Sequence, residues 1–170
     1  MPIQRLNHAV LYVRDAEKAA VFYCEVLGFR TVHEGPGAVF LQAAGSTNDH
    51  DLGLFSIGDA AGPTTAGRSS VGLYHLAWEV DTLDELERIA KALADAGALV
   101  GASDHGASKS LYARDRDGIE FEVAWLVPAG ALDGQDHLSG RPLPLDLAAE
   151  KGRYGSDTLG GVGISTPAPA

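Results

Sequence analysis

Two histidines and one glutamate have the residue types and positions of a metal-binding set. His8 and His75 each begin a short run of β-type residues, and Glu122 lies inside another such run. Two neutral imidazoles and a carboxylate, with positions left open for other ligands, form the facial triad that suits non-heme Fe(II). A single strand histidine is more often only structural, and Glu122 could simply reach solvent. The metal-binding hypothesis therefore depends on elements that bring the three side chains together.

The two histidines begin similar segments. His8 starts the run HAVLYV and His75 starts the run HLAWEV, and an aspartate and a helical pattern follow each run closely. Successive side chains of a strand point to opposite faces, so each histidine lies opposite the apolar residues that would pack on the helix. The two segments form a weak internal repeat. We therefore expect both imidazoles to point into the concavity of the sheet.

The run that contains Glu122 divides its faces in the same way. One face carries the apolar side chains of Phe121, Val123 and Trp125. The opposite face carries Glu120, Glu122 and Ala124. The Glu122 carboxylate is thus directed toward the same concavity as the histidines. Two repeat-related histidines and an inward carboxylate are hard to obtain by chance, so the metal-binding interpretation outweighs the structural one.

The residues after His8 predict the element order β-α-β-β-β. Residues 7–13 alternate as a strand does, and Asp15 is placed to cap the helix that follows. The helical spacing of apolar residues ends at Gly28, a typical C-terminal stop. Three short β-type runs separated by turn residues complete the module: 29–32, 38–43 and 51–57.

The same order returns with His75. Residues 74–80 alternate, and Asp81 is placed to cap a helix that Gly97 closes. Three further β-type runs follow at 98–102, 108–115 and 119–127. The sequence therefore predicts an α+β fold built from two βαβββ modules.

The composition along the chain separates the two modules from a connector and a tail. The connector is rich in Gly, Ala, Thr and Ser, and the tail is rich in Pro and Gly. Within the tail only 143–149 is apolar enough to dock on a folded surface, and we expect 160–170 to be disordered. The predicted segments are a first module at 1–57, the connector at 58–70, a second module at 71–127 and the tail at 128–170.

Charge and composition exclude several classes of function. The 170 residues carry 13 Lys and Arg against 23 Asp and Glu, and the formal net charge of −10 disfavours binding to a phosphate backbone. The single cysteine, Cys24, cannot form an internal disulfide. The sequence has no signal-peptide pattern and no apolar run near the roughly 20 residues that span a bilayer. We therefore expect a cytoplasmic protein that binds neither nucleic acid nor a membrane.

Two segments of the chain resemble the vicinal oxygen chelate superfamily. NHAVLYVRDAEKAAVFYCEVLGF resembles the family's opening strand and helix, and DRDGIEFEV resembles its closing turn and glutamate-bearing strand. Arg116 stands where the family usually has proline in that turn. The resemblance covers about Arg5 to Trp125. It implies two βαβββ modules that form an incomplete mixed β-barrel around a metal site, with His8, His75 and Glu122 as ligands.

The internal repeat helps to choose a branch of this family. Glu122 follows His75 by 47 residues, and the same offset from His8 leads to Phe55. Glyoxalase I, which this chain resembles in architecture, places a fourth ligand, a glutamate, on that strand of the first module. The positions around Gly53 provide no glutamate, and Asp51 is the only nearby substitute. A three-ligand site is therefore favoured.

Three further features resemble extradiol dioxygenases in particular. His50-Asp-Leu-Gly resembles the His-Asp-Ile-Ala stretch beside their substrate, and Asp104-His105-Gly106 resembles their His-Gly beside the metal site. Tyr112 precedes Glu122 by ten residues, as their active-site tyrosine precedes its ligand. His50 and His105 could also be ordinary turn residues, and Tyr112 a core residue. The remaining histidines, His33 and His137, have no partner pattern.

The chemistry explains why such residues would be needed. A catechol must lose protons to chelate iron, and a later step must regain one, so the resemblance implies that His50 and His105 transfer protons. Tyr112 would hydrogen-bond a diol oxygen and fix its orientation. The implied metal is Fe(II), with Zn, Ni, Mn and Co as alternatives.

The resemblance favours an Fe(II)-dependent extradiol dioxygenase that opens an aromatic diol ring with O2. The alternatives are a glyoxalase-like lyase or isomerase and a non-catalytic protein that binds a small molecule such as an antibiotic. The sequence names no substrate, and it leaves open whether one chain or two complete the site. Exposed sheet edges and the family's habits predict a homodimer or a higher homo-oligomer.

Overall fold

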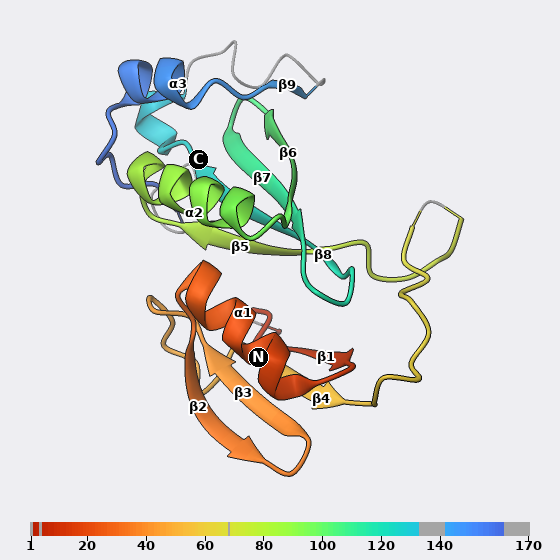
Figure 1. Cartoon of the computed structure of the whole chain (residues 1–170). Helices are drawn as coiled ribbons and strands as arrows, with labels where there is room; N and C mark the ends of the chain where they lie inside the picture. The colour runs from red at the N-terminus through yellow and green to blue at the C-terminus, as the bar shows by residue number, and fades with distance from the viewer. Residues whose placement is uncertain (1, 4, 68, 133–141, 162–170) are drawn as a thin grey trace. The chain divides into compact units, whose positions relative to one another are not determined.

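The α+β fold predicted from the sequence is confirmed, and it is divided between two units (Figure 1). The computed structural model describes residues 2–3, 5–67, 69–132 and 142–161. His137 and residues 162–170 lie outside these ranges. The first unit comprises Met1–Thr65 and Asp115–Gly118, and the second comprises Ala66–Arg114 and Ile119–Ala170.

The first unit contains a four-stranded mixed sheet with the strand order β1-β4-β3-β2. β1 is parallel to β4, and the other pairs are antiparallel. Helix α1 packs against the sheet and buries one of its faces (Figure 1). The elements are β1 (Ala9–Val13), α1 (Ala16–Leu27), β2 (Arg30–Gly35), β3 (Ala38–Gln42) and β4 (Leu52–Ser56).

The second unit repeats this plan and extends it by one strand, in the order β5-β8-β7-β6-β9. β5 is parallel to β8, as β1 is to β4, and the other pairs are antiparallel. The elements are β5 (Leu76–Val80), α2 (Leu83–Asp95), β6 (Leu99–Asp104), β7 (Ser108–Arg114), β8 (Glu120–Leu126), the 3₁₀ turn η1 (Ala129–Ala131), β9 (Leu143–Pro144) and α3 (Leu147–Tyr154).

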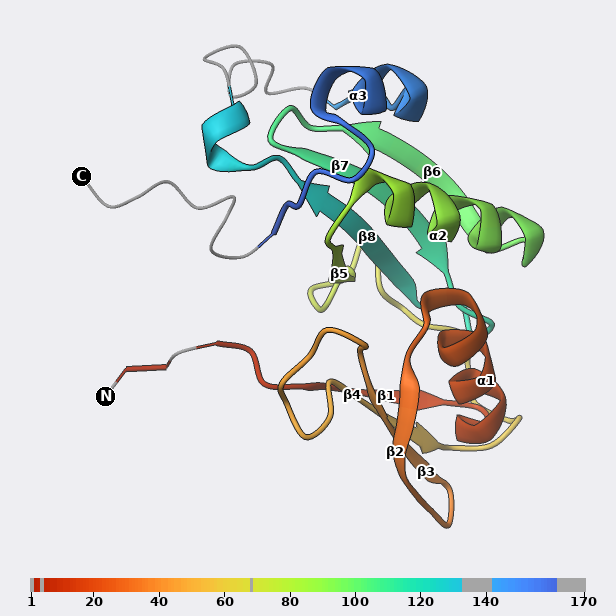
Figure 2. The ribbon, with the colours of Figure 1, turned by 90° about the vertical axis from the view of Figure 1, so that its left-hand side faces the viewer.

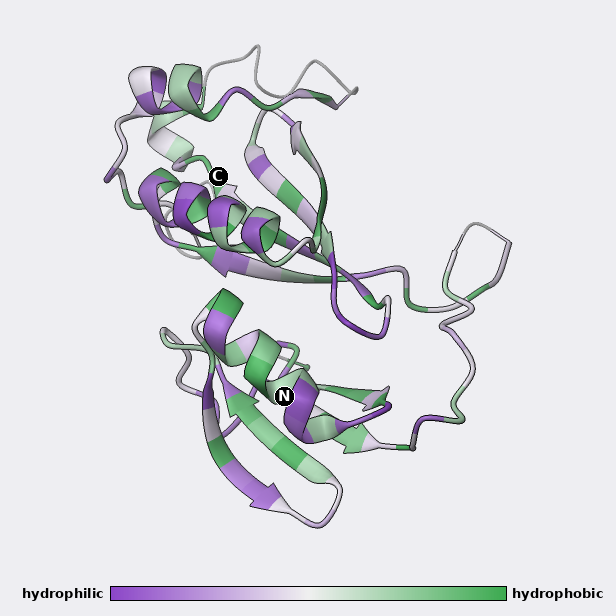
Figure 3. Ribbon diagram, viewed as in Figure 1, coloured by the Kyte–Doolittle hydropathy of each residue, from purple (hydrophilic) through white to green (hydrophobic). Residues whose placement is uncertain are grey.

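The burial of side chains follows the alternation that the sequence predicts. In β1, Leu11 and Val13 are buried while Val10 and Tyr12 are exposed. In β8 the three apolar residues at 121, 123 and 125 are almost fully buried. β3 is hydrophobic along most of its length, whereas the edge strand β2 is largely hydrophilic (Figure 3). In each unit the helix therefore covers one face of the sheet, and the histidine-bearing face is the other.

Both repeats carry the same irregularity, which strengthens the internal repeat seen in the sequence. The pairing of β2 with β3 shifts register between Thr31 and His33, and the pairing of β6 with β7 shifts between Leu99 and Gly101. Such bulges insert one extra residue into a strand and change which face the following side chains occupy. The bulged residues are both valines.

The helix ends test the predicted caps. Asp15 caps α1 by accepting a hydrogen bond from the Lys18 N–H, and Gly28 ends α1 with a φ of 76°, so both predictions are confirmed. The prediction that Asp81 caps α2 is wrong. Thr82 is the cap, and its hydroxyl accepts a hydrogen bond from the Glu85 N–H at 3.2 Å. Thr-x-x-Glu is the capping-box pattern, which favours this register.

The turn at 115–118 is held inside the first unit by two side chains. The hydroxyl of Tyr23 donates to Asp115 Oδ2 at 3.0 Å, and Arg14 forms an ion pair with Asp117. Burial, followed by the charge of Asp115, raises the pKa of Tyr23 well above its ordinary value. The phenol therefore stays protonated and keeps its donor role. This turn leads directly into β8, the strand that carries Glu122.

The tail forms more structure than the sequence predicts. Leu143 and Pro144 pair with β6 as β9, and α3 lies beside α2 (Figure 2). Lys151 of α3 forms ion pairs with Asp84 and Glu87 of α2, at 2.7 and 2.5 Å. The segment 143–149, predicted to dock on a folded surface, is thus attached to the second unit through β9 and α3, and the ion pairs of Lys151 accompany this attachment. None of the described helices is both long and apolar enough to cross a bilayer.

Lys109 anchors α3 from inside the second unit. Its side chain is fully buried, and Nζ lies 2.5 Å from Asp104 Oδ1 and 2.9 Å from Glu150 Oε2. Lys109→Met should lower the free energy of unfolding by about 3 kcal/mol, because two largely buried carboxylates would lose their cation. Urea unfolding measures this, and Lys91→Met, which removes an exposed pair with Asp95, should cost less than about 1 kcal/mol. Equal losses would contradict this role of Lys109.

Candidate metal centre

His75 and Glu122 face each other on neighbouring strands of the second unit. His75 immediately precedes β5, and Glu122 lies on β8, where it is the register partner of Ala77. His75 Nε2 lies 3.0 Å from Glu122 Oε2, and both side chains are largely buried. The strands thus bring together two of the three predicted ligands.

The distance between these two atoms fits a shared cation. A neutral imidazole nitrogen and a carboxylate oxygen both carry lone pairs, so a close approach requires a proton or a cation between them. Two ligand atoms that each lie about 2.1 Å from a metal, at about a right angle, are about 3.0 Å apart. The donor set of this pair therefore fits a divalent metal.

Tyr112 and His105 lie beside this pair. Tyr112 is on β7, directly opposite Glu122, and its ring centroid is 6.0 Å from that of His75. Its hydroxyl lies 2.8 Å from His105 Nε2. The turn between β6 and β7 carries His105, and Asp104 shapes this turn by accepting a hydrogen bond from the Gly106 N–H. The structure therefore brings together His75, Glu122, Tyr112 and His105 in one unit.

Burial raises the pKa of the Tyr112 hydroxyl above its ordinary value of about 10, and the Glu122 charge raises it further. The phenol is therefore protonated at neutral pH. Its oxygen can accept a hydrogen bond while its proton is donated to His105 Nε2. With the opposite imidazole tautomer, Nε2–H donates and the phenol proton is directed elsewhere.

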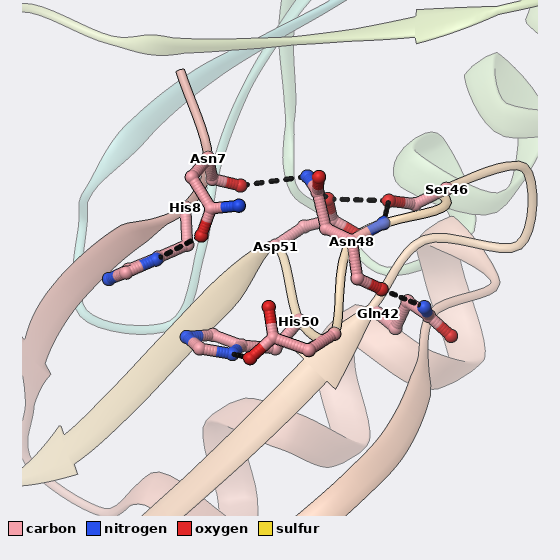
Figure 4. A network of polar contacts seen from close by, with 8 residues as sticks. Asn7, His8, Gln42, Ser46, Asn48, His50 and Asp51 are labelled. Carbon is pink, nitrogen blue, oxygen red and sulfur yellow. Dashed lines mark hydrogen bonds and ion pairs between the residues drawn. The ribbon is translucent and has the colours of Figure 1, made fainter. Parts of the chain in front are cut away.

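In the first unit, His8 lies beside His50. Their ring centroids are 4.4 Å apart, with the planes tilted by 37° (Figure 4). His8 Nδ1–H donates to Asn7 Oδ1 at 2.8 Å, and His50 Nδ1–H donates to Asp49 Oδ2 at 2.9 Å. In both rings Nε2 then carries the lone pair. Metal-binding histidines usually have such a partner on the second nitrogen, so His8 fits the role of a ligand through Nε2.

A polar network fixes the loop that carries His50 (Figure 4). The Asp51 carboxylate accepts hydrogen bonds from the Ala43 N–H, the Ser46 hydroxyl and the Asn48 amide. The Asn48 amide also donates to the Asn7 carbonyl at 2.8 Å, which ties this loop to the segment before β1. Asp51 is therefore occupied with loop structure, and the network holds His50 next to His8.

In each sheet the strand register defines a row of residues that runs across neighbouring strands. The two sheets contain equivalent rows. In the second unit the row runs Ala77, Glu122, Tyr112 and Gly101 across β5, β8, β7 and β6. In the first unit it runs Val10, Gly53, Phe40 and His33 across β1, β4, β3 and β2. The counterpart of each site residue can therefore be read directly from its place in the row.

These rows correct the repeat alignment derived from the sequence. The counterpart of Glu122 is Gly53, not Phe55, because the paired positions are 45 residues apart in the second unit (77 and 122) and 43 in the first (10 and 53). This position carries no carboxylate, and a Cβ on Gly53 would be in van der Waals contact with the side chains of Val10, Phe40 and Phe55, at 3.4 to 3.5 Å. The first sheet is apolar where the second carries its ligand.

His33 belongs to the same face as the site histidines, which the sequence interpretation missed. Its ring centroid is 5.8 Å from that of Phe40, and Phe40 in turn is 5.1 Å from His50. The bulge at Val32 changes the alternation within β2, so residue counting from the start of this strand misplaces His33. Asn7 and Asp49 were also missed, although each directly precedes the histidine that it orients.

The predicted site residues are thus divided between the units. His8 and His50 lie in the first, and His75, His105, Tyr112 and Glu122 lie in the second. Across the parts of the chain that the structure describes, no three His, Cys, Asp or Glu side chains gather into a metal-binding group. The three-ligand set therefore remains a proposal built from these two parts.

Comparison with known proteins places the chain in a family. The model of the Glyoxalase/Bleomycin resistance protein/Dioxygenase superfamily matches residues 5–123. The chain belongs to this superfamily. The resemblance seen in the sequence is confirmed at this level, and the family's name covers more than one kind of activity.

Named relatives include dioxygenases. The chain is 30% identical over 118 residues to catechol-2,3-dioxygenase from Bacillus subtilis, covering 69% of this chain and 40% of that protein. It is also 30% identical over 162 residues to biphenyl-2,3-diol 1,2-dioxygenase 3 from Rhodococcus globerulus, covering 92% of this chain and 75% of that protein. The chain therefore spans less than half of the first relative and three quarters of the second.

A solved structure supports the fold. A glyoxylase/bleomycin resistance protein/dioxygenase domain from Frankia sp. EAN1pec matches 72% of this chain and 92% of its own length, with a TM-score of 0.59 and 24% identity. At this identity the likeness concerns the fold alone.

Proposed function

We propose that this chain is a metal-dependent extradiol dioxygenase that opens an aromatic diol ring beside its hydroxyls with O2. The observation that carries the proposal is the arrangement in the second unit, where the His75–Glu122 pair lies beside a tyrosine hydroxyl bonded to His105. The names of the two dioxygenase relatives agree with this activity.

His8, His75 and Glu122 would hold the metal, for which Fe(II) suits two imidazoles and one carboxylate. Zn, Ni, Mn and Co are the alternative metals. When bound, iron supplies the redox chemistry that joins dioxygen to the ring. The protein supplies ligand geometry: Asn7 fixes the His8 ring through Nδ1, and the parallel pairing of β5 with β8 fixes His75 beside Glu122.

Tyr112 and His105 would bind and orient the diol. A neutral phenol can accept a hydrogen bond from a diol hydroxyl and donate its own proton to His105 Nε2. The pair then moves a proton from the diol toward the turn between β6 and β7, and the reverse movement returns it. The 2.8 Å separation of their polar atoms allows either direction.

His50 is the proposed acid–base residue of the first unit. Asp49 accepts the Nδ1–H, so the imidazole presents Nε2 to a substrate, and contact with Phe40 holds the ring on this face. A positioned histidine can give or take a proton at that atom.

Anaerobic loading with Fe(II), followed by a screen of catechols, tests the proposal. We expect a coloured ring-opened product and uptake of one O2 for each diol consumed, with both lost in Glu122→Gln protein. The Zn- and Ni-loaded proteins should be tested in parallel for isomerisation of a thiol–aldehyde adduct. Isomerisation without ring opening would instead identify a glyoxalase-like enzyme, and tight small-molecule binding without turnover would identify a binding protein.

A further inference from the structure

A pocket of about 200 Å³ lies in the second unit beside Tyr112. Its walls include Tyr74, Val100 and Gly101, and all of its lining residues belong to this unit. The Tyr74 ring also contacts that of His75, with centroids 4.6 Å apart and the planes tilted by 57°. The pocket therefore adjoins the candidate metal centre.

The pocket exists because the row that contains Glu122 and Tyr112 ends in a glycine. Gly101 is the register partner of Tyr112, and a Cβ built on it would meet no heavy atom within 4 Å. The first unit shows the alternative, since the equivalent position is His33, whose ring lies against Phe40. One repeat fills this position with a side chain, and the other leaves it open.

The walls of the pocket suit an apolar group. Tyr74 and Val100 are more than half exposed, and the bulge in β6 places Val100 outward at this site. The carboxylate of Glu120, which also borders the pocket, is paired with Arg114 at 3.0 Å. A cavity of about 150 Å³ is enough to hold benzene. The pocket can thus accept an apolar group up to the size of one six-membered ring.

We propose that this pocket holds an apolar substituent of the aromatic diol and that Gly101 determines this specificity. Neighbouring strands are about 4.8 Å apart, so Gly101 lies about 10 Å from Glu122 along the row. A diol whose hydroxyls reach His75 and Glu122 extends its ring past Tyr112, and a ring substituent then enters the space above Gly101. The nature of this ligand rests on the proposed function, whereas the shape of the pocket does not.

The test compares Gly101→Leu with wild type, using catechol and 3-phenylcatechol as probes under anaerobic conditions. Binding is followed by ¹H–¹⁵N NMR, so that no turnover is needed. We expect 3-phenylcatechol to shift the Gly101 amide in wild type and to bind at least about 10-fold more weakly to Gly101→Leu, since even one methylene in a hydrophobic pocket is worth about 10- to 200-fold in discrimination. Catechol binding should change less than about 3-fold.

Gly35→Leu is the matched control, because Gly35 also lies in a strand and has open space at its Cβ. This variant should bind both probes as wild type does. Gly101→Ala is a smaller change that should also weaken the binding of 3-phenylcatechol. It provides the test if Gly101→Leu does not fold. An equal loss of binding for both probes, or no loss of 3-phenylcatechol binding, would overturn the pocket assignment. Selective loss without ring opening would support the pocket and refute the dioxygenase.

Discussion

Protein with His75→Ala or Glu122→Ala should bind no stoichiometric metal and still unfold cooperatively. Each side chain lies on the face of its sheet opposite the helix, so neither fills the core. Removing one of three ligands leaves two donors, which is too few to hold a divalent metal tightly. Elemental analysis after Fe(II) or Zn loading measures the metal, and circular dichroism measures the fold.

Glu120→Ala is the control for this prediction. Glu120 is on the same strand and face as Glu122, but its carboxylate is paired with Arg114. It should retain a full equivalent of metal, and His8→Ala should lose it. Wild-type metal content in both His75→Ala and Glu122→Ala would remove the basis of the proposed site.

The sequence predicted the sheet faces well because alternation with a period of two is a strong signal. Val13 and Val123 are buried as predicted, and the helix limits at Asp15 and Gly28 follow from local capping chemistry. A single inserted residue reverses every later side chain in a strand, and a bulge leaves no clear mark in composition. His33 and Gly101 follow such bulges, and both were missed.

The candidate site was predictable only in part. The pairing of His75 with Glu122 follows from strand faces, whereas the hydrogen bond between His105 and Tyr112 depends on the path of a turn that spacing does not define. The attachment of α3 through buried Lys109 could not be predicted either, because a lysine within a strand gives no indication of distant carboxylates. Long-range ion pairs require the fold before they can be assigned.

Tyr112→Phe should retain metal and lose kcat by about 10²-fold, the usual range for an acid–base group. The substitution keeps the ring, its contact with His75 and its place opposite Glu122, and it removes only the hydroxyl that lies 2.8 Å from His105. The variant would therefore keep its metal content while its turnover falls. The comparison requires kcat measured at saturating catechol and oxygen, and metal content measured on the same samples.

A double-mutant cycle shows whether the hydroxyl acts together with His105. If the two form one proton path, His105→Ala should cost a similar factor, and the double variant should be little slower than the slower single variant. His50→Ala, in the other unit, should also retain metal and lose turnover, and its effect should multiply with that of Tyr112→Phe. A tyrosine that only packs in the sheet predicts a wild-type kcat for Tyr112→Phe, because the aromatic ring is unchanged. Wild-type rates in both Tyr112→Phe and His50→Ala would return the glyoxalase-like activity to first place.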